Sequence, residues 1–131
     1  MDRDYADNES DPAHPRFEHA LFVKSQVMSV GARHAVVDAG HKSHAVDSGL
    51  PRVHDPVGSA PTPSRTPATS TASCAPAEGA ALPELGETIW LVPGHCDPTV
   101  NLYDRYLGVR GGLAEGRVER VIEIDARGAV T

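Results

Sequence analysis

The sequence is short of cysteine, of basic residues and of long apolar runs, and each shortage excludes a class of protein. Two cysteines among 131 residues cannot build the disulfide framework of a small secreted domain. No apolar stretch approaches the roughly 20 residues that cross a bilayer, and the acidic N-terminus lacks an apolar signal segment, so we expect a cytoplasmic protein with no membrane partner. Twelve basic against eighteen acidic residues give a net charge of −6, which disfavours nucleic acid as a partner.

The chain length allows one modest domain and excludes a complete (β/α)8 barrel. Residues 1–16 are polar, and we expect them to form a disordered terminus. Between residues 56 and 77, eighteen of twenty-two residues are Pro, Ser, Thr or Ala, with no apolar periodicity. Such a composition predicts a low-complexity segment without regular structure. We therefore predict one domain over residues 17–131, interrupted at residues 56–77.

Short β-type segments separated by Gly and Pro predict a small, mostly β fold that is barrel-like or sandwich-like. Residues 20–30 alternate in a way that favours a strand. Val23 and Val27 belong to one face of this strand. Met28 and Val30 belong to the other. Further strands are predicted at residues 33–38, 87–92, 103–109 and 117–124.

The segment Pro93-Gly94-His95-Cys96-Asp97-Pro98-Thr99 contains three residue types that bind metals. If the backbone is extended here, His95 and Asp97 point to the same side and can bind one divalent ion, while Cys96 faces away. This pair suits Mn, Mg or Zn, and it leaves most coordination positions to water or substrate, as a catalytic site requires. The alternative is a surface turn in which Asp97 binds backbone amides. A fixed imidazole also needs a second hydrogen-bonding partner, which the sequence does not identify.

Other polar residues fit structural roles. His41 and His44 are three residues apart and could chelate a metal, but no thiol or carboxylate stands at a matching spacing, so we expect surface imidazoles. Asp38, Asp47 and Ser48 flank turns, where such residues usually bind backbone amides.

A longer string gives the metal interpretation more weight. Leu91-Val92-Pro93-Gly94-His95-Cys96-Asp97-Pro98-Thr99-Val100-Asn101-Leu102-Tyr103-Asp104, followed by Val109-Arg110-Gly111-Gly112, resembles the C-terminal region of the D-threonine aldolase and D-serine dehydratase-like family. Residues 36–42 and 46–51 resemble the preceding segment of that family. The resemblance implies a pyridoxal-phosphate enzyme of the alanine-racemase-like type, in which a barrel binds the cofactor through a lysine and a C-terminal β domain completes the site.

In that family, a His-x-Asp or His-x-Cys pair in the β domain binds a divalent metal, and the matching positions are His95 and Asp97. The Asp form resembles the aldolase branch, which implies Mn or Mg, with Zn as the alternative. The implied reaction is cleavage of a D-3-hydroxy amino acid, with the metal binding the substrate hydroxyl. Dehydration of D-serine and cleavage of 3-hydroxyaspartate stay open as alternatives.

The barrel has no counterpart in this sequence. Lys24 and Lys42, the only lysines, fall in blocks that match the β domain, so we assign no catalytic or cofactor-binding residue. We expect a fragment that is inactive alone and binds pyridoxal phosphate only with a separately encoded barrel as partner. The alternative is a non-catalytic remnant of a truncated gene. In that case residues from after Asp55 to about Ala75 could be translated out of frame. One possible set of GC-rich codons for residues 68–75 reads Asp-Glu-His-Gly in another frame, and the family normally has a motif of this type at that position.

Overall fold

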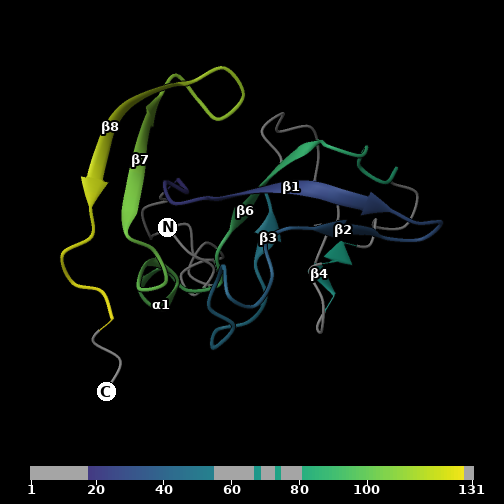
Figure 1. Ribbon diagram of the computed structural model, residues 1–131, viewed down its shortest axis with the longest axis horizontal. Coiled ribbons are helices and arrows are strands. Elements are labelled where there is room, and N and C mark those ends of the chain that lie inside the picture. Colours follow the sequence, from purple (N-terminus) through teal and green to yellow (C-terminus); the bar gives the residue numbers. More distant parts are fainter. Residues whose placement is uncertain (1–17, 55–66, 69–72, 75–80, 129–131) are drawn as a thin grey trace, which may run out of the picture.

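The computed structural model describes residues 18–54, 67–68, 73–74 and 81–128, most of whose regular structure is β-strand (Figure 1). The strands are β1 (Val23–Val30), β2 (Ala35–Val37), β3 (Arg52–Val53), β4 (Pro67–Ala68), β5 (Ser73–Cys74), β6 (Thr88–Val92), β7 (Arg105–Arg110) and β8 (Arg117–Glu123). The described residues contain one helix, α1 (Cys96–Val100), and no helix among them is long and apolar enough to span a membrane. The predicted mostly β fold is confirmed.

Two antiparallel sheets organise these strands. The larger has the order β3-β6-β1-β2-β5-β4, with the long strand β1 near its centre. Its strand directions turn strongly between β1 and β3, so this sheet is curled (Figure 1). The smaller sheet is the β7–β8 hairpin, which lies beyond one end of β1.

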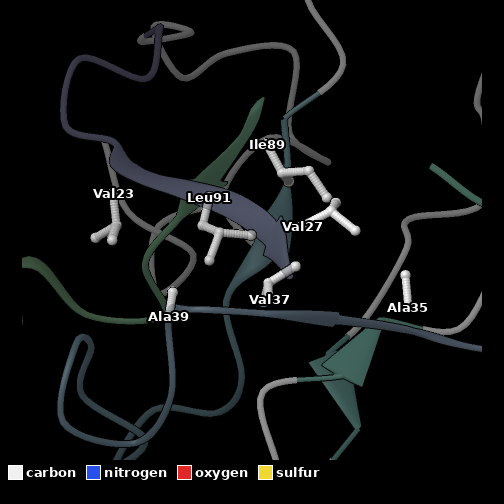
Figure 2. Close-up of a cluster of buried hydrophobic side chains, with 7 residues drawn as sticks. All are labelled: Val23, Val27, Ala35, Val37, Ala39, Ile89 and Leu91. Carbon is white, nitrogen blue, oxygen red and sulfur yellow. The ribbon is translucent and has the colours of Figure 1, made fainter. Parts of the chain in front are cut away.

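The predicted alternation of β1 is confirmed. Val23 and Val27 are buried, whereas Met28 and Val30 are exposed. Ser25 shares the buried face, which the apolar pattern did not indicate. The core lies between β1, β2 and β6, and Figure 2 shows its side chains. They are Val23, Val27, Ala35, Val37, Ala39, Ile89 and Leu91.

The structure differs from the sequence prediction within the segment 56–77. β5 pairs with the edge of β2, and β4 pairs with β5. The four residues of these strands are joined by backbone pairing, which the composition of the segment does not predict. The rest of this segment and the predicted terminus at residues 1–16 lie outside the described residues. The structure therefore does not test the out-of-frame hypothesis.

Candidate metal centre

The loop that follows β2 is anchored at its first residue, Asp38. The backbone N–H of Gln26 donates to Asp38 Oδ1 at 2.9 Å, and the buried hydroxyl of Ser25 donates to the same oxygen at 2.7 Å. The N–H of Ala39 donates to Ser25 Oγ at 3.2 Å. These bonds, that from Gln26 above all, lower the pKa of the Asp38 carboxyl. The prediction that Asp38 binds backbone amides is confirmed, and the loop leaves the sheet in a fixed direction.

Further along, residues 43–49 of this loop contact residues 94–103, an arrangement we call the clasp. The Tyr103 hydroxyl donates to the carbonyl of Ser43 at 2.7 Å. The N–H of Ala45 donates to Thr99 Oγ1 at 3.0 Å. Two segments that are far apart in sequence are thereby held side by side.

Thr99 is the buried centre of the clasp. Only 2% of the residue is exposed, and its hydroxyl also donates to the carbonyl of His95 at 2.7 Å. One hydroxyl group therefore links the backbone of His95 to the backbone of Ala45. Since water cannot replace a group this deeply buried, the two hydrogen bonds fix where His95 sits.

A glycine pair closes the other end of the clasp. A Cβ atom built on Gly94 would lie 2.5 Å from the carbonyl oxygen of Gly49, closer than any real Cβ contact. Gly94 is also buried. The residue just before His95 must therefore lack a side chain if the loop is to pack against it.

Between these contacts, Asp47 meets His95. Nδ1 of His95 and Oδ2 of Asp47 are 2.7 Å apart, although the two residues are 48 positions apart in sequence. The His95 side chain is 33% exposed and that of Asp47 is 52% exposed. The hydrogen bond from His95 is the main reason why the pKa of the Asp47 carboxyl is lowered. Asp47 is the partner for a fixed imidazole that the sequence did not identify. Backbone hydrogen bonds at Ser48 and at Asp47 itself, which we expected at this turn, also lower the pKa of the carboxyl.

The backbone at the motif differs from the extended form that the i, i+2 argument requires. His95 itself is extended, with φ −142° and ψ 129°, but α1 begins at Cys96. Asp97 and Pro98 lie in the first helical turn, where a proline costs no intrahelical hydrogen bond and an acidic side chain is favoured. The extended-strand argument for bringing His95 and Asp97 onto one face is therefore wrong. The Asp-Pro pair is the signal that could have indicated a helix start here.

The donor atoms near the start of α1 are accessible but few. Asp97 is exposed, while Cys96 is half-buried and is not part of a disulfide. Among the residues that the structure describes, no group of three or more His, Cys, Asp or Glu side chains could hold a metal ion. Any metal bound by His95 and Asp97 would thus have most of its ligands from water, substrate or another chain.

The two histidines of the second candidate pair, His41 and His44, differ in exposure. The N–H of Ser43 donates to the carbonyl of Gly40 at 2.8 Å, which forms a tight turn. His41 is exposed, as predicted, but His44 is only 4% exposed, so the prediction of a surface imidazole is wrong there. Burial of His44 lowers the pKa of its imidazole, and the nearby His41 lowers it further.

Comparison with known proteins places this geometry in context. Residues 20–109 match the family model described as "Putative serine dehydratase domain". The chain is 40% identical over 120 residues to a 3-hydroxy-D-aspartate aldolase of Paracoccus denitrificans, covering 86% of this chain and 27% of that protein. It is 40% identical over 129 residues to a D-threonine aldolase of an Arthrobacter species, covering 98% of this chain and 32% of that protein.

A solved structure is similar as well. The crystal structure of D-threonine aldolase from Filomicrobium marinum matches with a TM-score of 0.79 and 44% identity, over 100% of this chain and 34% of that one. The chain therefore spans about a third of the length of the relatives that it matches.

Proposed function

The chain belongs to the serine dehydratase domain family, and from this we propose that it is the metal-binding β domain of a lyase that cleaves D-3-hydroxy amino acids, as its relatives' names indicate. His95 and Asp97 are the proposed metal ligands. The observation that carries the proposal is the position of the His95 imidazole. Its Nδ1 lies 2.7 Å from Asp47 Oδ2, and His95 stands immediately before the first helical turn, which contains Asp97. An imidazole bonded at one nitrogen to a carboxylate is typical of histidines that bind metals.

The donor set fits a divalent cation. It offers one imidazole nitrogen and one carboxylate oxygen, both on side chains that solvent reaches. A carboxylate favours the harder ions Mn and Mg over Zn, although Zn also accepts this pair. Such an ion would supply a Lewis acid that binds and polarises the hydroxyl of the substrate. His95 and Asp97 would orient it, and the clasp would keep the imidazole still.

The substrate is a D-3-hydroxy amino acid, and two relatives support different side chains. One is a D-threonine aldolase and the other a 3-hydroxy-D-aspartate aldolase, at the same 40% identity. We favour the aldol cleavage over dehydration of D-serine because Asp97 occupies the position at which the resemblance associates a cysteine with the dehydratases.

Pyridoxal phosphate belongs to the proposed complete enzyme and needs a barrel-type partner. Lys24 and Lys42 are both exposed, and Lys24 Nζ lies 6.0 Å from the centre of the Trp90 ring on the neighbouring strand. This supports a role for Lys24 in covering the sheet rather than in binding a cofactor. This chain does not match about two thirds of the D-threonine aldolase relative. We propose that the unmatched part contains the barrel that supplies the cofactor lysine.

Complementation tests the proposal. The purified chain is mixed with the separately produced barrel region of the Arthrobacter D-threonine aldolase, and glycine release from D-threonine and from 3-hydroxy-D-aspartate is measured with Mn²⁺. We expect cleavage that depends on both components and disappears with His95→Ala or Asp97→Ala. The matched controls His34→Ala and Asp125→Ala change exposed residues away from the motif and should keep it.

The competing hypothesis is a non-catalytic remnant. It predicts no cleavage in the mixture and no rise in the melting temperature of the chain with Mn²⁺. If the chain binds metal as proposed, a free Mn²⁺ concentration about 100 times the dissociation constant should stabilise the fold by about 2.7 kcal/mol. The absence of both effects would contradict the proposed function.

A further inference from the structure

We propose that Asp47 is a positioning residue that sets the tautomer and orientation of His95, so that Nε2 is the nitrogen that binds the metal. This inference rests on the proposed function for its consequence, but its structural half can be tested without any metal. The evidence is the 2.7 Å contact between Asp47 Oδ2 and His95 Nδ1, together with the clasp that brings the two residues together.

The chemistry of the contact fixes one proton. An ionised carboxylate only accepts hydrogen bonds, so in the neutral imidazole the N–H must be on Nδ1. The Asp47 side chain is 52% exposed, and an exposed aspartate is ordinarily ionised at neutral pH. Nε2 then carries the lone pair that a metal requires. A carboxylate in this place also raises the basicity of the ligating nitrogen.

The exposure of the contact indicates that it contributes little to the stability of the fold. Both side chains are substantially exposed, and hydrogen-bonded ion pairs at such positions contribute little to stability. The loop has other contacts on both sides of Asp47, since the N–H of Ala45 donates to Thr99 and Gly49 packs closely against Gly94. Removal of the Asp47 carboxyl should therefore leave the clasp in place while the imidazole loses its hydrogen bond at Nδ1.

Asp47 also reaches His95 from a different part of the sheet. It lies in the loop between β2 and β3, whereas His95 follows β6. The orientation of the His95 ring therefore depends on the position of residues 43–49. The buried contacts at Thr99 and Gly94 would hold this loop in place. The exposed contact between Asp47 and His95 could then orient the ring without stabilising the fold itself.

The first experiment uses the metal-free full-length chain. Long-range ¹H–¹⁵N spectra of the histidine ring identify which nitrogen of His95 carries the proton. We expect the Nδ1–H form in the unmodified chain and a change toward the Nε2–H form in Asp47→Ala. Asp125→Ala is the control and should leave the His95 signals unchanged. An Nε2–H tautomer in the unmodified chain, or the same tautomer with and without Asp47, would overturn the proposal.

The second experiment measures Mn²⁺ affinity by the loss of the free-ion signal in electron paramagnetic resonance. We expect Asp47→Ala to weaken binding about 10- to 100-fold, the usual cost of losing such a partner. Asp47→Glu restores a carboxylate and should recover part of the affinity. Thermal unfolding of each variant, followed by circular dichroism, should shift little, which separates positioning from loss of fold.

The two experiments distinguish the possible failures. If the unmodified chain shows the Nδ1–H tautomer but binds no Mn²⁺, the proposed function fails while the assignment of Asp47 to His95 stands. If Mn²⁺ binds equally well with and without Asp47, the positioning role is wrong and the metal site stands. Equal destabilisation of the fold and of metal binding by Asp47→Ala would also contradict a positioning role.

Discussion

Replacement of Thr99 by valine tests whether the clasp is as firmly built as its contacts indicate. Valine has nearly the shape of threonine but lacks the hydroxyl that accepts from Ala45 and donates to His95. Each net hydrogen bond contributes about 0.5 to 1.5 kcal/mol, and an unsatisfied buried group costs about 1 to 3 kcal/mol. With only 2% of Thr99 exposed, water cannot compensate. We expect Thr99→Val to lower the free energy of unfolding by about 2 kcal/mol.

Urea unfolding followed by circular dichroism measures this change. With a slope near 2 kcal/mol per molar urea, the midpoint should fall by about 1 M. Thr99→Ser keeps the hydroxyl and should lose much less, mainly the contacts of one methyl group. A free energy of unfolding for Thr99→Val within about 0.5 kcal/mol of that of the unmodified chain would contradict this role of Thr99. A serine variant as unstable as the valine variant would contradict it as well.

Three further predictions follow from other parts of the fold. Gly94→Ala should destabilise the chain by about 1 to 3 kcal/mol in urea, because the new Cβ would meet the Gly49 carbonyl at 2.5 Å; unchanged stability would contradict the close packing. Leu91→Ala, at a fully buried position, should cost about 2 to 5 kcal/mol in the same assay, whereas Leu85→Ala on the surface should cost little. Below pH 6.5, His44 should reduce stability: its lowered pKa means that the unfolded chain takes up a proton first, so stability is complete above 6.5 and declines as the pH falls toward the folded pKa. Melting temperatures between pH 7 and 5 should show this decline, and His44→Gln should flatten it; a slope that survives the substitution would assign it to another group.

The sequence predicted the sheet well because its signals are local. The alternation in residues 20–30 placed Val23 and Val27 in the core and Met28 and Val30 on the surface, as observed. Side-chain direction in a strand follows directly from residue parity, so a short window of sequence is sufficient. The burial of Ser25 was not predicted from its apolar neighbours, because it involves a hydrogen bond to Asp38, which directly follows β2.

The site was less predictable because its geometry is nonlocal. His95 and Asp97 were identifiable as donors from the motif, but the start of α1 between them depends on which backbone form the prolines permit. The contact between Asp47 and His95 joins residues 48 positions apart, and no pattern in one sequence pairs them. The burial of His44 likewise depends on the direction in which a tight turn faces, which the spacing to His41 does not determine.

The measurement that tests the account most directly is a Mn²⁺ titration of the metal-free chain at neutral pH, with the bound ion counted per chain. We expect one site, lost on His95→Ala and on Asp97→Ala but retained in the exposed-residue controls His34→Ala and Asp125→Ala. Saturable binding that survives both ligand substitutions, or no binding in the unmodified chain, would contradict it.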